Sequence, residues 1–133
     1  MNNLQRSPAE HISIILPNQP VPMLGPLDLQ VTISATVNVS AEQARRKVNR
    51  YIHKQVSYLM HGEPPNLMVA EQVYWRVPII FTYPSHGTLG TVGYIDVEVE
   101  TGELKLRPET ITEIKQHAQM LADHSTPETA PAG

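Results

Sequence analysis

Apolar and polar residues alternate most regularly over residues 29–39. The apolar positions are Leu29, Val31, Ile33, Ala35, Val37 and Val39, and polar residues occupy every position between them. Because side chains on a β-strand point alternately to its two faces, this pattern predicts a strand with one buried and one solvated face.

A period of three to four residues replaces the alternation from residue 40 onward. Ser40 and Gln43 have the spacing of a capping box, in which each side chain bonds the backbone N–H of the other residue. Val48 and Ile52 belong to an apolar stripe that predicts an amphipathic helix over residues 40–62. A glycine followed closely by two prolines is expected to end this helix.

Alternation returns over residues 73–83 and 91–99, which predicts two further strands. Pro78 has no N–H to give to a neighbour, so the first of these is expected at a sheet edge or with a β-bulge. Thr101 and Gly102 are expected to turn the chain into a short returning strand. The predicted core residues are Val48, Ile52, Trp75, Val77, Ile79, Ile95 and Val97.

The last periodic segment begins at Pro108, a residue that fits the first position of a helix. The elements together predict an α+β fold, with an amphipathic helix on a small antiparallel sheet of three or four strands and a C-terminal helix. We expect a proline-rich arm over residues 1–27, the folded domain over 28–123 and a disordered tail over 124–133. A short strand is expected within the arm, at residues 12–16.

Composition narrows the class of protein. A chain of 133 residues has room for one domain, and the absence of cysteine excludes disulfides, thiolate metal sites and a cysteine nucleophile. The apolar run at residues 12–16 is too short for a membrane span or a signal sequence, and an acidic residue and a histidine precede it. We therefore expect a cytoplasmic protein that does not bind membranes.

Charge is distributed unevenly, although the net charge is only −3. Basic residues cluster on the predicted first helix at Arg45, Arg46, Lys47, Arg50 and Lys54, and acidic residues cluster on a predicted strand at Asp96, Glu98 and Glu100. Three readings of the basic face stay open: a solvated surface, a site for an acidic protein, and a site for nucleic-acid phosphates. Carboxylates on one face of a strand lie roughly 7 Å apart, too far for all three to hold one metal ion, so we expect no metal site. The acidic face is either a solvated surface or a partner-binding site that pairs with a basic surface, such as the Arg46 and Arg50 face of another copy.

The remaining chemistry-bearing residues form no catalytic pattern. The six histidines are scattered, and no two of them stand at the spacing of a metal-binding pair on one helix. Ser85 and His86 are adjacent, an arrangement that we do not expect to make a nucleophile and its base. We therefore expect no catalytic residues and no cofactor.

Three short segments resemble the PepSY family of small α+β domains. They are the helix opening Ser40-Ala41-Glu42-Gln43-Ala44, the strand segment Tyr74-Trp75-Arg76-Val77, and the run from Ile95 to Leu104 with its Val99-Glu100-Thr101-Gly102-Glu103 turn. The resemblance covers residues 40–106 and implies a helix packed on a small antiparallel sheet that binds or restrains another protein. The family has no catalytic residues to carry over, and the strand segments are also similar to small uncharacterised prokaryotic proteins.

Our leading hypothesis from the sequence is a non-catalytic protein-binding or regulatory module, inhibitory in character. Its partner would be another protein or a second copy of this chain, paired across residues 29–39. The alternative is an antitoxin-like regulator associated with nucleic acid, in which Arg45, Arg46, Arg50 and Lys54 contact phosphates. An enzyme is the third alternative.

Overall fold

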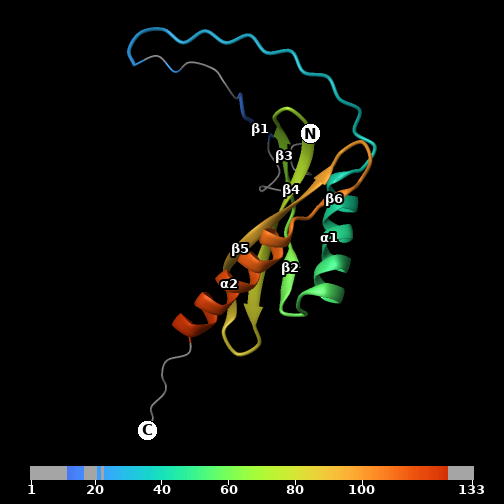
Figure 1. Ribbon diagram of the computed structural model, residues 1–133, viewed down its shortest axis with the longest axis vertical. Coiled ribbons are helices and arrows are strands. Elements are labelled where there is room, and N and C mark those ends of the chain that lie inside the picture. Colours follow the sequence, from blue (N-terminus) through green and yellow to red (C-terminus); the bar gives the residue numbers. More distant parts are fainter. Residues whose placement is uncertain (1–11, 17–20, 22, 126–133) are drawn as a thin grey trace, which may run out of the picture.

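The computed structural model describes residues 12–16, 21 and 23–125, and within this part of the chain it has an α+β fold (Figure 1). The elements are β1 (Ile12–Ile14), α1 (Ala41–Gln55), β2 (Met60–Gly62), β3 (Asn66–Val69), β4 (Val73–Tyr83), β5 (Gly87–Glu98), β6 (Leu104–Lys105) and α2 (Pro108–Ser125). The predicted α+β class with a C-terminal helix is confirmed. Helix α2 runs to Ser125 and so includes the first two residues that we assigned to the tail.

The strands form one six-stranded sheet in the order β1-β3-β4-β5-β6, with β2 pairing to β4 beyond the end of β3. The sheet therefore exceeds the three or four strands predicted. It is also mixed, because β1 pairs with β3 in parallel while the other pairs are antiparallel. Strands β2 and β3 have only three and four residues, too few for alternation to distinguish them from a loop.

Helix α1 begins as predicted and ends earlier than predicted. The Ser40 hydroxyl accepts a hydrogen bond from the Gln43 N–H at 3.1 Å, and the Gln43 side chain accepts one from the Ser40 N–H at 2.8 Å. The helix ends at Gln55, and the chain then turns into β2. Gly62, which we expected to terminate the helix, lies in β2, where a Cβ atom would come within 2.8 Å of Val77 Cγ1. The glycine is needed for close packing rather than for a helix end.

The core lies between the sheet and the two helices. Six of the seven residues that the sequence assigns to it are fully buried: Val48, Ile52, Val77, Ile79, Ile95 and Val97. Helix α2 adds Ile114 and Ala118 to the same cluster. Trp75 is only partly buried and packs against the cluster from its margin.

Strand β4 is central, contrary to the predicted edge position at Pro78. It pairs with β5 on one side and with β2 and β3 on the other. The Pro78 carbonyl accepts a hydrogen bond from Glu63 N at 2.9 Å, so the side of Pro78 that has no N–H faces the gap between β2 and β3. One of the two register shifts between β4 and β5 lies next to this position, between Ile79 and Ile80, which agrees with the β-bulge predicted as the alternative to an edge position. Proline is tolerated in this central strand because neither β2 nor β3 pairs with β4 at Pro78, so the missing N–H leaves no ladder bond unmade.

The strand predicted over residues 29–39 is absent. These residues are extended but join no ladder, and residues 27–38 are exposed to solvent throughout. Alternation specifies the extended backbone, whereas a strand also requires a neighbouring strand to pair with. Of the helices in the described ranges, neither is long and apolar enough to cross a membrane.

Candidate protein-binding surfaces

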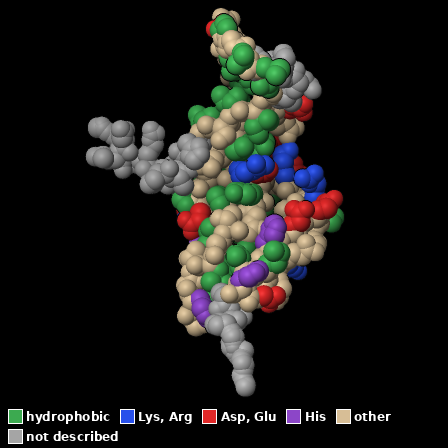
Figure 2. Space-filling model, turned by 90° about the vertical axis from the view of Figure 1, so that its left-hand side faces the viewer, with side chains coloured by type: hydrophobic (Ala, Val, Ile, Leu, Met, Phe, Trp, Pro, Cys, Tyr) green, Lys and Arg blue, Asp and Glu red, His purple; other side chains and the backbone are tan. Residues whose placement is uncertain are grey.

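A run of exposed apolar side chains lies on residues 27–38, which we call the extended segment. Figure 1 shows this segment as an arc that stands away from the sheet and helices and joins the start of α1, and Figure 2 shows green apolar side chains gathered on it. Leu27 and Leu29 are 62% and 54% exposed, and Ile33 is still 44% exposed. Monomeric proteins rarely leave a contiguous apolar patch of this kind uncovered, so this segment is a candidate interface.

The C-terminal end of the extended segment is fixed to the domain. The amides of Asn38 and Val39 both donate to the Val99 carbonyl, at 2.8 and 3.1 Å. The Asn38 side-chain amide also donates to the Glu100 carbonyl at 3.1 Å. The Val39 carbonyl in turn accepts a 2.7 Å hydrogen bond from the indole of Trp75. These bonds hold the end of the segment against the turn after β5.

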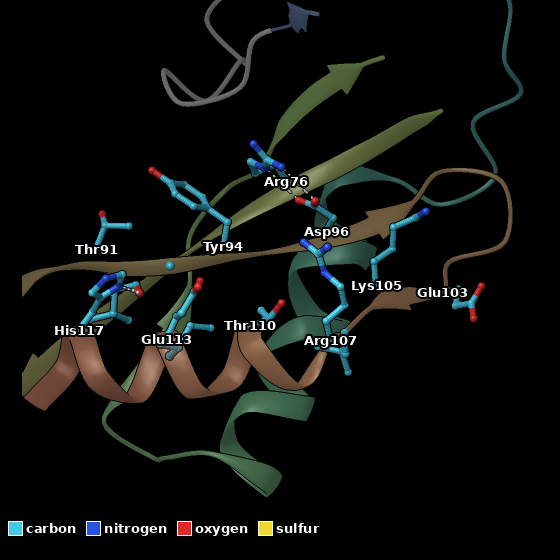
Figure 3. Close-up of a pocket in the computed structure, with 14 residues that line it drawn as sticks. Arg76, Thr91, Tyr94, Asp96, Glu103, Lys105, Arg107, Thr110, Glu113 and His117 are labelled. Carbon is cyan, nitrogen blue, oxygen red and sulfur yellow. Dashed lines mark hydrogen bonds and ion pairs between the residues drawn. The ribbon is translucent and has the colours of Figure 1, made fainter. Parts of the chain in front are cut away.

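A second candidate is an open groove of about 860 Å³ between α2 and the free edge of β5 (Figure 3). Strand β6 pairs with β5 at Asp96 and Val97, and among the described residues β5 continues past it without a strand neighbour on that side. Helix α2 runs alongside this part of β5, and Nδ1 of His117 donates to the Val92 carbonyl at 2.9 Å. Because a carbonyl can only accept, this bond places a proton on Nδ1.

Arg76 and Asp96 line one side of the groove and are held together by an ion pair. They lie opposite each other on β4 and β5, and the guanidinium donates to both carboxylate oxygens at 3.0 and 3.1 Å. The guanidinium also lies 5.5 and 5.7 Å from the ring centroids of Tyr74 and Tyr94. The hydrogen bonds to Asp96 raise the pKa of Arg76 above its ordinary value. This arginine is therefore satisfied within the chain and is not free to bind an anion.

The basic face of α1 is partly neutralised by its own helix. Arg45 donates to Glu42 through Nε at 3.0 Å and through Nη2 at 2.6 Å, and Arg46 approaches the same carboxylate at 3.6 Å. Lys47 donates to the Gly102 carbonyl. Arg50 and Lys54 are exposed and have no hydrogen-bond or ion-pair partner among the described residues. Of the four cations assigned to partner binding, two remain available.

The three acidic residues do not form one surface. Asp96 is bound by Arg76, and Glu98 accepts a hydrogen bond from the Thr101 hydroxyl at 2.8 Å. Glu100 lies in the turn after β5 rather than on the strand, which corrects the expected row of three carboxylates. Thr101 is part of this turn, and Gly102 has a positive φ of 77° just after it.

The side chains of Ser85 and His86, which we did not expect to make a nucleophile and its base, are in contact. The Ser85 hydroxyl lies 2.9 Å from His86 Nδ1 in the exposed β4–β5 turn. A hydrolytic site also needs a third group that orients the base and a pocket that excludes water. The groove described above does not include these two residues. Within the described ranges, no group of three or more His, Asp or Glu side chains is placed to hold a metal ion.

The groove was not found from the sequence. The pairing of Arg76 with Asp96 follows from the β4–β5 register, and two register shifts in that hairpin prevent its deduction by counting back from the turn. A signal was nevertheless present, because an arginine and an aspartate each lie on the outward side of predicted neighbouring strands.

Comparisons with protein-family models, curated proteins and solved structures found no match to this chain.

Proposed function

We propose that this chain is a non-catalytic protein-binding module with a regulatory or inhibitory role, and that it binds its partner by β-strand pairing through the extended segment. The observation that carries the proposal is the exposure of alternating apolar side chains on a backbone that belongs to no ladder. Fully burying one such side chain stabilises a complex by roughly 1.5–3 kcal/mol. Adding a strand to a partner would bury the apolar side chains and pair the backbone in one step.

The composition of the segment supports this proposal. After Asp28, residues 29–39 contain no charged residue and no proline. Proteins usually protect a strand that must stay unpaired by placing lysine, another charge or proline on it. Their absence is what we expect of a strand that has a partner. The resemblance of residues 40–106 to PepSY domains, which implies binding or restraint of another protein, adds to the proposal.

The charged surfaces contribute less to it than the sequence suggested. Glu42 pairs with two of the four cations on α1, and Arg76 pairs with Asp96 across the sheet. The observed ion pairs do not favour nucleic-acid binding, because Arg50 and Lys54 alone would release few counterions from a phosphate backbone. A cytoplasmic location is part of the proposal, and fractionation of the native host would test it.

Site-specific photo-crosslinking in the native host tests this function. A photoreactive amino acid at Ile33 should give a covalent adduct with a protein, whereas the same group at Met120, an exposed position on α2, should not. Replacing Val31 with lysine in the crosslinking chain should suppress the adduct. The proposal fails if position 33 yields no more adduct than position 120.

A further inference from the structure

We infer that the partner of the extended segment is a second copy of this chain, with residues 29–39 of the two copies paired as antiparallel strands about a two-fold axis. This inference rests on the proposed function and names the partner of the same surface. Closed two-fold dimers are also the commonest form of protein self-association.

The described part of the chain offers the extended segment no strand to pair with. Helix α2 runs alongside the outer edge of β5 beyond β6, across the groove, and His117 donates to the Val92 carbonyl there. The C-terminal end of the segment is held at the turn after β5 by the bonds of Asn38 and Val39 to Val99. Within the described ranges the segment therefore has no ladder partner, and a second chain must supply one.

The extended segment is also complementary to itself. Two antiparallel strands related by a two-fold axis perpendicular to their ribbon place residue c−k opposite residue c+k, where c lies on the axis. The residue numbers c−k and c+k are either both odd or both even. Because the apolar residues occupy the odd positions from 29 to 39, an apolar residue always lies opposite another apolar residue. Since directly opposite residues point to the same face, every apolar side chain of both copies gathers on one face of the ribbon.

The polar face is equally suited to self-pairing. It carries Gln30, Thr32, Ser34, Thr36 and Asn38, none of which is charged. Directly opposite like charges would destabilise such a ribbon, whereas threonine and serine pairs across two strands stabilise it. The nearest charged residue, Asp28, lies just outside the paired region.

The apolar face of the paired strands needs further apolar side chains to cover it. A two-stranded ribbon alone is marginally stable in water, so the interface needs further apolar surface. Met23 and Leu24 precede the segment and are 96% and 93% exposed, so they are available to supply it. The dimer interface that we infer therefore extends from residue 23 to residue 39.

Single-cysteine scanning tests the inference directly, because the chain contains no cysteine. Cysteine would replace residues 29–37 one at a time in the full chain, with Met120→Cys as the control for random collision. Mild oxidation should give disulfide-linked dimers that peak at one position, because only the residue on the two-fold axis faces its own copy within reach of a disulfide. The yield should fall on both sides of that position.

Light scattering gives the second readout. The wild-type chain should have the mass of a dimer, and Ile33→Lys should raise the dimer dissociation constant by about a hundredfold or more, because each dimer loses two buried isoleucines. Gln30→Lys, on the polar face, should change it far less. Ile33 is already 44% exposed in the single chain, so the variant should keep its circular dichroism spectrum.

The two proposals fail in different ways. A monomeric wild type with no cysteine position above the Met120→Cys control overturns the inference. If photo-crosslinking at Ile33 then still captures a different protein, the proposed function stands with another partner. If neither experiment gives a product, both proposals are wrong.

Discussion

The indole Nε1 of Trp75 donates a 2.7 Å hydrogen bond to the carbonyl of Val39. This bond joins the centre of the sheet to the point where the extended segment ends and the cap of α1 begins. It also explains why Trp75 lies at the margin of the core rather than within it, since the polar end of a partly buried indole needs an acceptor.

We predict that Trp75→Phe lowers the free energy of unfolding by about 1–2 kcal/mol, because the Val39 carbonyl loses its donor and the smaller ring fills the site less well. Urea denaturation followed by circular dichroism would measure this. The amides of Asn38 and Val39 should also exchange with solvent faster. Tyr58→Phe, at a side chain 86% exposed, is the control and should change stability by less than about 0.5 kcal/mol.

The contact of Gly93 with Ile114 sets the distance between β5 and α2. A Cβ at Gly93 would lie 2.6 Å from Ile114 Cγ1, so Gly93→Ala should cost about 1–3 kcal/mol through overpacking. Ile114→Ala should cost about 2–5 kcal/mol by leaving a cavity. The loss in free energy of unfolding of the double variant should be smaller than the sum of the two single losses by at least about 1 kcal/mol. The reason is that the alanine at 114 makes room for the new methyl group. Strict additivity in a double-mutant cycle would contradict the predicted contact.

Arg76 should contribute to stability although it lies in the groove. Replacement by methionine keeps the length of the side chain but removes the paired bonds to Asp96 and the contacts with two tyrosine rings. Because the Arg76 side chain is 35% exposed, solvent screening limits the expected loss to about 1–2 kcal/mol. Arg107→Met in the same groove loses no ion pair or side-chain hydrogen bond to the described residues and should be nearly neutral. Equal effects of the two replacements would count against the Arg76–Asp96 pair.

Glu42 should titrate below the ordinary range of a glutamate. Hydrogen bonds from Arg45 are the main reason for its lowered pKa, and the charges of Arg45 and Arg46 add to it. A pKa lowered by folding contributes stability above the unfolded-state pKa, and this contribution is lost as pH falls through the folded-state pKa. NMR titration should show the Glu42 pKa rising in Arg45→Met and rising less in Arg46→Met. An unchanged Glu42 pKa in Arg45→Met would contradict the assignment.

Local patterns were sufficient to predict most of the regular structure. The capping box at Ser40 and the stripe through Val48 and Ile52 specify α1, because helix hydrogen bonds and caps form within the segment itself. The alternations in β4 and β5 specify long strands with a buried face, and Pro108 opens α2 as expected. Each of these signals depends on residues close together in the sequence.

The sequence alone did not determine how the segments meet. Residues 29–39 have the alternation of a strand, but whether they form one depends on a neighbouring strand, and the described part of the chain does not provide it. The groove, the Arg76–Asp96 pair and the number of strands depend on register and on short strands whose pairing is stabilised only by the rest of the sheet. The sequence determines the backbone conformation that each residue prefers. Strand pairing is a contact between residues far apart in the sequence, so only the tertiary structure decides which segments with a strand preference find a strand to pair with in the same chain.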